Sequence, residues 1–250
     1  MEKILAIDIG NSNTVIGFFI GRKIKWHRRF ETDKTLSHLR KFSPKDVDGV
    51  VVASVVPKIN RPLRLMLRKK FSLEPIFVTS KIKLPIKIKT KIPLQVGADR
   101  IANAVGAYYQ SPTSLLVVDF GTATTFDVIS EKGEYLGGAI IPGLGLCVQV
   151  LHEKTAKLPR VKIKKPARVI GKETRECIQS GLYYGYAGMV DRLVEKIQKE
   201  YGKKMRVIAT GGLAGLIAKE CKTIQANYPF LTLKGLQLIY KQNEGTAQGV

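Results

Sequence analysis

The hydrophobic positions of the first eighty residues follow a pattern of strands and then helices. Apolar, largely β-branched runs at 4–7, 14–20 and 24–30 are separated by turn residues at 8–13 and 21–23. This pattern predicts a meander of three strands. We then expect a short helix at 36–42, a buried strand at 49–56, a helix at 59–71 with an apolar residue every four positions, and a strand at 76–78.

The same order of elements begins again at residue 115. Apolar runs at 115–118 and 126–129 flank a turn, and we expect further strands at 135–141 and 206–210 and helices from 143, at 174–201 and at the C-terminus. Aligning Asp8-x-Gly10-x-x-x-Thr14 with Asp119-x-Gly121-x-x-x-Thr125 gives an offset of 111 residues. The chain is therefore predicted to consist of two similar α/β domains, residues 1–112 and 113–250.

Two segments between these halves have patterns of their own. Residues 79–96 alternate Lys with Ile, which fits an edge strand, but Pro85 and Pro93 favour an extended connector. Residues 98–110 are predicted to be helical, with small residues on a face that can pack closely: Ala102, Ala104, Gly106 and Ala107.

Composition and net charge limit the class of protein and the ligands that it can attract. Of 250 residues, 42 are Lys or Arg and 20 are Asp or Glu, so the formal net charge is +22, while 44% of the residues are hydrophobic. This composition excludes a disordered or collagen-like chain. A positive surface attracts nucleic acid, acidic membranes and phosphorylated metabolites alike. Because no helix-turn-helix, zinc-finger or RNP pattern accompanies the charge, we expect a solvated basic face and no nucleic-acid partner.

Cysteine usage and hydropathy predict a cytoplasmic protein without a membrane segment. The three cysteines are too far apart for a CxxC pair and too few for a disulfide framework. Asp8 stands where a signal peptide needs its apolar stretch. The longest uncharged run, 135–151, is shorter than the ~20 residues of a membrane span and contains four glycines and Pro142.

The two repeated loops have the chemistry of a phosphate site. In each, an acid ends a strand, Gly follows two positions later, and side chains that can donate hydrogen bonds come next. Gly10 lets the backbone approach a phosphate, and Asp8 can orient Mg²⁺. Together with Thr210-Gly211-Gly212, this pattern resembles the actin, sugar kinase and heat-shock ATPase superfamily. The resemblance implies two duplicated actin-like (ribonuclease H-like) domains with an interdomain nucleotide cleft. Neither GxGxxG nor GxxxxGK[ST] follows a predicted strand.

A closer resemblance, to the type III pantothenate kinase family, extends over nearly the whole chain. The matching segments are Asp8–Thr14, Ser54–Pro57, Val96–Ile101, Val118–Thr125, Gly137–Gly143, Gln179–Gly181, Gly185–Asp191, Thr210–Gly212 and Leu231–Leu236. The family uses ATP to phosphorylate the primary hydroxyl of pantothenate, the first step of coenzyme A biosynthesis. The resemblance therefore implies a phosphotransferase.

The resemblance also implies residue roles. ATP phosphates would bind Asp8, Ile9, Gly10, Asn11, Ser12, Asn13, Thr14, Val15 and Thr122. Asp119 would lie at a monovalent-cation site for K⁺ or NH₄⁺, and Asp8 would hold Mg²⁺. Pantothenate would bind Gly97, Ala98, Asp99, Arg100 and Thr174, with Asp99 as the catalytic base and Arg100 pairing with the anionic substrate. The family forms homodimers, and the helix that contains Tyr183, Tyr184 and Tyr186 is our candidate for the subunit contact, although these tyrosines also fit a core.

Two departures from the family pattern keep alternatives open. Thr90-Lys91-Ile92-Pro93 replaces a segment with an aromatic residue that covers pantothenate, and Glu173 replaces an Asn. One alternative is therefore a kinase for another small hydroxy acid. Another is a non-catalytic relative like the Bvg accessory factors, associated with nucleic acid. Retention of Asp8, Asp99 and Asp119 favours the enzyme, because a binding module has no need of these carboxylates.

Overall fold

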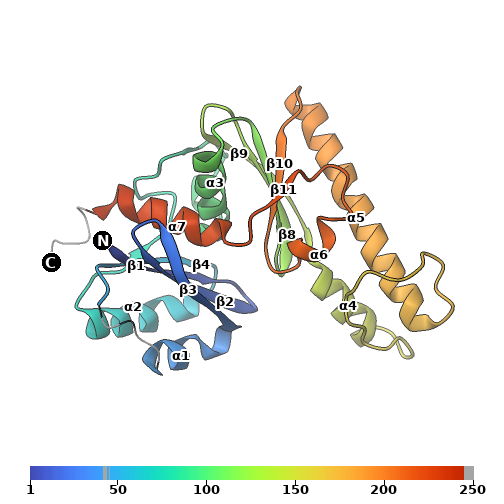
Figure 1. The fold of residues 1–250 in the computed structure, drawn as a ribbon, viewed down its shortest axis with the longest axis horizontal. Helices are drawn as coiled ribbons and strands as arrows, with labels where there is room; N and C mark the ends of the chain where they lie inside the picture. The colour runs from blue at the N-terminus through green and yellow to red at the C-terminus, as the bar shows by residue number, and fades with distance from the viewer. Residues whose placement is uncertain (42–43, 45, 245–250) are drawn as a thin grey trace. The chain divides into compact units, whose positions relative to one another are not determined.

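The computed structural model describes residues 1–41, 44 and 46–244 and divides into two compact units (Figure 1). The first unit contains residues 1–112, 133–135 and the chain from Leu231, and the second contains residues 113–132 and 136–230. The expected division into 1–112 and 113–250 therefore differs from these units in residues 133–135 and in the C-terminal helix. Phe42, the predicted end of a helix, and residues 245–250 lie outside the described part of the chain.

The first unit is built on a five-stranded sheet in the order β3-β2-β1-β4-β5. Its strands are β1 (Lys3–Ile9), β2 (Asn13–Ile20), β3 (Lys23–Glu31), β4 (Gly49–Ser54) and β5 (Ile76–Phe77). The first three form the predicted antiparallel meander, and β4 and β5 are added in parallel. Helices α1 (Thr35–Lys41) and α2 (Pro57–Phe71) contribute Leu39, Leu63 and Leu67 to its buried core.

The sheet of the second unit repeats this topology in the order β9-β8-β7-β10-β11. The strands are β7 (Leu115–Phe120), β8 (Ala123–Ile129), β9 (Glu134–Pro142), β10 (Arg206–Thr210) and β11 (Ala226–Asn227). As in the first sheet, the first two are antiparallel and the last two are parallel additions. Equal strand order in both sheets confirms the predicted duplication. In the first unit, the short β6 (Lys87–Ile88) pairs with the first residues of β9, Glu134 and Tyr135.

Three helices complete the second unit: α4 (Leu144–Glu153), the long α5 (Thr174–Tyr201) and the short α6 (Ala214–Ile217). Tyr183 and Tyr186 on α5 are buried in the core beside α6 and the sheet. The Tyr186 hydroxyl donates to Thr124 Oγ1 at 2.6 Å and lies 2.9 Å from Pro142 O. These two tyrosines therefore have the core role that the sequence left open. In the described residues, no helix has the length and apolar character of a membrane span.

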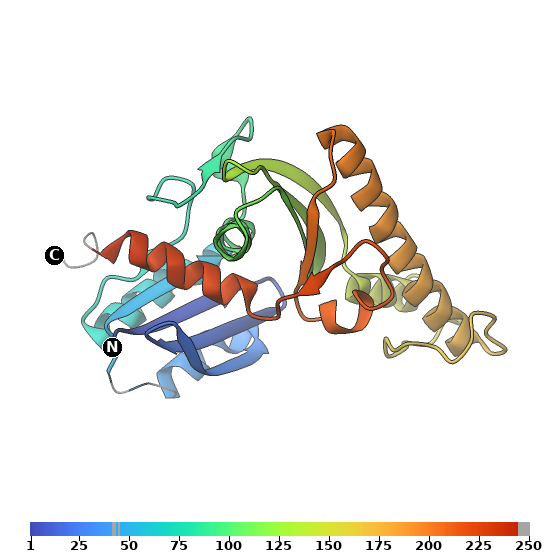
Figure 2. The same cartoon turned by 45° about the horizontal axis from the view of Figure 1, so that its top comes forward.

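Helix α3 (Ala98–Gln110) packs closely against α7 (Leu231–Gln242), as both views show (Figures 1 and 2). A β-carbon on Gly235 would lie 1.8 Å from Ala102 O, and one on Gly106 would lie 2.7 Å from Leu231 O. The predicted small face of α3 therefore exists and is covered by α7. This packing, together with contacts of α7 to β1 and β4, explains why α7 belongs to the first unit.

Candidate active site

The first candidate loop connects the carboxyl end of β1, the central strand of the first sheet, to β2. Asp8 pairs with Val15 and Ile9 with Thr14, which closes the hairpin, and the Gly10 amide donates to Asn13 O at 3.0 Å. Asp8 is half-buried at the end of β1, whereas Asn11 and Ser12 are exposed. The loop therefore presents a carboxylate and exposed polar groups at one place.

Three buried threonine hydroxyls support this loop from inside the unit. Thr14 Oγ1 lies 2.7 Å from Thr35 Oγ1, and Thr32 Oγ1 donates to Gly10 O at 2.7 Å. The Thr14 side chain is fully buried, so its hydroxyl holds the loop in shape. Sequence reasoning missed Thr32 and Thr35, because nothing in their spacing connects them to the loop.

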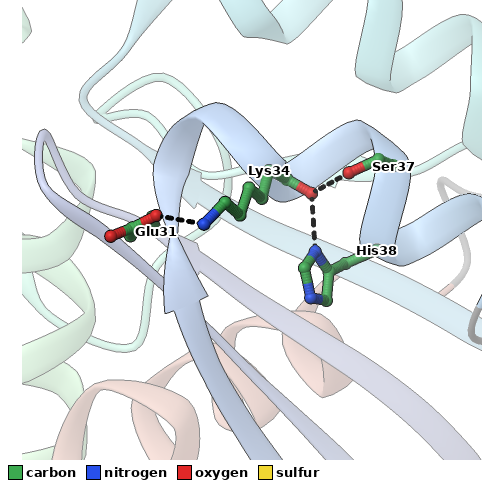
Figure 3. A network of polar contacts seen from close by, with 4 residues as sticks. All are labelled: Glu31, Lys34, Ser37 and His38. Atoms are coloured by element: carbon green, nitrogen blue, oxygen red, sulfur yellow. Dashed lines mark hydrogen bonds and ion pairs between the residues drawn. The ribbon is translucent and has the colours of Figure 1, made fainter.

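The turn that begins with Thr32, η1 (Thr32–Lys34), has a polar outer face (Figure 3). Lys34 forms an ion pair with Glu31, and its carbonyl oxygen accepts from Ser37 Oγ at 2.9 Å and lies 3.0 Å from His38 Nδ1. The hydrogen bond from Lys34 lowers the pKa of Glu31. These contacts link the end of β3 to the start of α1 and so help to hold the threonine support in place.

The second loop is one residue shorter than the first. Asp119 pairs with Thr125 and Phe120 with Thr124. Because Ile9 pairs with Thr14 in the first hairpin, the structural counterpart of Thr14 is Thr124, and the alignment of Thr14 with Thr125 is wrong by one position. Thr124 is buried and receives the Tyr186 hydroxyl, so it supports its loop as Thr14 does.

Asp119 ends β7 beside the loop that follows β10. Thr210 is its parallel partner, and a β-carbon on Gly211 would lie 2.3 Å from Asp119 Oδ1. Gly211 also has a φ of +95°, in the left-handed region that favours glycine. The Gly143 amide donates to Thr122 O at 3.0 Å. The second unit therefore brings together Asp119, Thr122 and the predicted glycine pair.

Asp99 lies in the first turn of α3. Its Oδ1 accepts from the Arg100 amide at 2.8 Å, and burial raises the pKa of the carboxyl, an effect that this hydrogen bond and the charge of Arg100 oppose. The Arg100 guanidinium lies over the buried ring of Tyr135, 5.7 Å from its centroid. Sequence reasoning did not identify Tyr135 as a support for this arginine.

Val55 connects the Asp99 segment to the first loop. The Val55 amide donates to Ile9 O at 3.0 Å, just before Gly10. A β-carbon on Gly97 would lie 2.5 Å from Asp99 Oδ1 and 3.7 Å from Val55 Cγ1. Asp99 and the first loop thus lie near the carboxyl ends of β1 and β4, where open α/β sheets bind ligands.

The remaining predicted residues have different surroundings. Thr90 follows Lys89, whose amide donates to Tyr135 O at 2.8 Å. Thr90 therefore lies in the segment that pairs with Tyr135, the residue under the Arg100 guanidinium. Its Oγ1 is buried and has no hydrogen-bond partner in the described structure. Glu173 and Thr174 are exposed at the start of α5 in the second unit.

The donor set at the two loops fits cations that are partly ligated by phosphate. No group of three or more His, Cys, Asp or Glu that could hold a metal occurs in the described chain. Mg²⁺ usually binds one or two carboxylates and completes its shell with water and phosphate oxygens. Single half-buried carboxylates, Asp8 and Asp119, are therefore appropriate ligands for a cation that arrives with a nucleotide.

Two sheets of equal topology, each with an acid and a glycine loop at the end of its first strand, define the class of actin-like and sugar kinase-like folds. An activator of 2-hydroxyisocaproyl-CoA dehydratase from Clostridium difficile, solved with bound ADPNP, has a TM-score of 0.56 at 13% identity and covers 98% of this chain and 97% of its own. A Baf family transcriptional activator structure from Campylobacter jejuni has a TM-score of 0.65 at 21% identity, covering 96% of this chain and 99% of its own. Such low identities show the fold alone.

The sequence comparisons are more specific. A family model described as type III pantothenate kinase matches residues 4–196. A type III pantothenate kinase from Moorella thermoacetica is 44% identical, over 96% of this chain and 99% of its own length. Another from Myxococcus xanthus is 45% identical, over 97% of this chain and its full length. The chain belongs to the type III pantothenate kinase family and is a kinase.

Proposed function

We propose that this protein transfers the γ-phosphoryl group of ATP to the primary hydroxyl of pantothenate, giving 4'-phosphopantothenate for coenzyme A biosynthesis. The observation that supports it most is the half-buried Asp99 carboxylate beside Arg100, close to a glycine loop of the actin-like type. Full-length similarity to curated pantothenate kinases supports the same substrate pair.

The phosphates of ATP are proposed to bind the backbone and polar side chains of residues 8–15 and Thr122. Fixed hydrogen bonds hold both loops in shape, so little ordering is needed when phosphate binds. The Thr14 hydroxyl supports the first loop, and the exposed Asn11 and Ser12 are better placed to donate to phosphate oxygens.

Asp8 is proposed to hold Mg²⁺, and Asp119 a monovalent cation, K⁺ or NH₄⁺. Such cations neutralise charge on the transferring phosphoryl group. Gly211 approaches Asp119 Oδ1 so closely that any side chain at this position would collide with the carboxylate. Both carboxylates also help to orient the loops on which they lie.

Asp99 is proposed to act as the catalytic base and Arg100 to bind the pantothenate carboxylate, with Gly97, Ala98 and Thr174 as further substrate contacts. A primary alcohol is a weak nucleophile, and a carboxylate within hydrogen-bond reach can accept its proton as the oxygen attacks phosphorus. The raised pKa of Asp99 makes it a stronger base than an exposed carboxylate. Tyr135 fixes the Arg100 guanidinium so that it can form paired hydrogen bonds with an anion.

A homodimer is proposed to form through α5. Gly181, Gly185 and Gly188 lie on an exposed face of this helix, next to the exposed Met189, and a β-carbon on any of the three would meet nothing within 4 Å. Glycine inside a helix costs about 1 kcal/mol relative to alanine. A helix of a second subunit could pack closely against this face because the glycines have no side chains, which would offset their cost.

The test is an ATP-dependent assay with Mg²⁺ and K⁺ that compares pantothenate with other small hydroxy acids. Pantothenate should give the highest kcat/KM and 4'-phosphopantothenate as product. A kinase for another acid would instead phosphorylate that acid faster, which the Thr90 and Glu173 departures would explain. Absence of phosphopantothenate under every cation condition would exclude the proposed function.

A further inference from the structure

A cavity of about 490 Å³ lies within the second unit, between the loop that precedes α5 and the first turns of that helix. This volume is within the range of about 300–1,000 Å³ that is typical of small-molecule sites. Its wall includes the buried side chains of Val161 and Pro166. Thr174, the proposed pantothenate contact, does not line it. None of the residues proposed above to bind ATP, a cation or pantothenate lines the cavity.

Hydrogen bonds from α5 hold the loop that forms the cavity. Gln179 Nε2 donates to Lys162 O at 2.8 Å, Cys177 Sγ to Gly171 O at 3.4 Å, and the Ser180 hydroxyl to Val169 O. These bonds hold the segment 162–171 at its beginning and at two places near its end. A ligand would thus meet a formed cavity and would pay little for ordering it.

The lining is rich in cationic side chains. Five of its residues are basic and two are acidic: Lys162, Lys164, Lys165, Arg168 and Arg175, with Glu173 and Glu176. Only one of these cations, Lys165, has an ion pair in the described structure, with Glu220 at 2.9 Å. One of the carboxylates, on Glu176, accepts the Lys172 amide at 2.9 Å. The cavity thus has an excess of positive charge that the protein itself does not neutralise.

We infer that this cavity binds a small anion with two or more phosphate groups. Neighbouring cations repel one another, and an anion of high charge density removes that repulsion at several of them together. Arg168 and Arg175 can each donate paired hydrogen bonds to phosphate oxygens, and the lysines add point charges. A monoanion such as pantothenate offers too little charge for this set. No residue of either candidate loop lines the cavity, and the inference does not depend on the proposed function.

The test is calorimetric titration of the full-length protein with inorganic pyrophosphate at about 0.15 M salt, where exposed charges are largely screened. The test variant is Arg168→Gln/Arg175→Gln. Its matched control is Lys154→Gln/Lys157→Gln, which removes the same charge from exposed positions that do not line the cavity. Circular dichroism melting checks that all three proteins are folded. Citrate, a polycarboxylate, is titrated in parallel.

The wild type and the lysine control should bind pyrophosphate within about twofold of each other, and the arginine variant should bind it at least tenfold more weakly. Citrate should bind the wild type more weakly than pyrophosphate does. Equal losses in the two variants would assign the binding to the general basic surface and overturn the inference. Absence of pyrophosphate binding to the folded wild type, or equal binding of citrate, would also overturn it.

Discussion

At the scale of single residues, Asp99 is under two opposing influences. Burial raises the pKa of its carboxyl, while the Arg100 amide and charge lower it, and burial has the larger effect. A base must be deprotonated to act, so its activity follows the ionised fraction. If Asp99 is the base, as proposed, its environment sets the pH at which the kinase becomes active.

We predict that kcat/KM for pantothenate rises with pH through the raised pKa of Asp99. The midpoint of this increase should lie at a higher pH than the ordinary aspartate pKa, which is about 3.9. A pH profile of kcat/KM at saturating ATP measures this directly. A profile that is already flat within one pH unit of that ordinary value would contradict a base with a raised pKa.

Thr90 provides a second test at this scale. Its buried Oγ1 has no partner within the described chain, and such a hydroxyl costs about 1–3 kcal/mol. Thr90→Val should therefore leave the free energy of unfolding unchanged or raise it, yet increase KM for pantothenate about fivefold or more if substrate satisfies the hydroxyl. Thr90→Ser, which keeps the hydroxyl, should stay near wild type. If Thr90→Val lost stability and kept its KM, the hydrogen-bond partner of the Thr90 hydroxyl would be a group of the protein, and the prediction would be wrong.

At the scale of elements, the α3–α7 contact depends on the absence of side chains. Gly235→Ala would place a β-carbon 1.8 Å from Ala102 O, so the helices would have to separate. We expect a loss of at least about 2 kcal/mol in urea denaturation. Gly215→Ala is the matched control, because its β-carbon would be 3.9 Å from its nearest neighbour. Equal stabilities of the two variants would contradict this packing.

The exposed glycines of α5 test the proposed dimer. Gly185→Trp should produce monomers in size-exclusion chromatography with light scattering, because the indole would hold a second helix away. Gly185→Ala should keep the dimer and gain up to about 1 kcal/mol from helix propensity. A monomeric wild type, or a tryptophan variant that stays dimeric, would exclude α5 as the contact.

The elements also indicate the limits of sequence reasoning. Periodicity predicted α3, α5 and β10 because each has a regular apolar face or a continuous apolar run. It could not assign α7 to a unit, since an apolar helix face does not specify which sheet it covers. Likewise, the Thr14 alignment failed because the second hairpin turns with one residue fewer, which only the pairing register reveals.

At the scale of the whole molecule, duplication gives each of the two units its own candidate loop. Each unit repeats one strand order and places an acid, Asp8 or Asp119, at the end of its first strand. The acid, glycine and hydroxyl pattern was sufficient to predict this from sequence. The threonine supports were not predictable, because they join residues from segments without a shared pattern. The basic cavity lies between residues 161 and 179, and a run of basic residues does not specify how its loop folds.

The basic residues behind the net charge of +22 differ in their surroundings. Arg64 and Arg68 both form ion pairs with Glu74, whereas the five lysines between 81 and 91 are exposed. Exposed charges of this kind raise the local concentration of anions without specifying one. We assign ligands to Arg100, which lies over Tyr135, and to the exposed cations that converge on the cavity.

The most direct test of the account compares phosphopantothenate formation by the wild type, Asp99→Asn and Asp33→Asn at saturating ATP, Mg²⁺ and K⁺. Asp33 is exposed in η1, so its variant controls for the loss of one negative charge. We predict that the wild type and Asp33→Asn turn over pantothenate at similar rates, and that Asp99→Asn, still folded, loses about 10²–10⁴-fold in kcat. Undiminished turnover by Asp99→Asn would contradict the central claim that this carboxylate accepts the substrate proton.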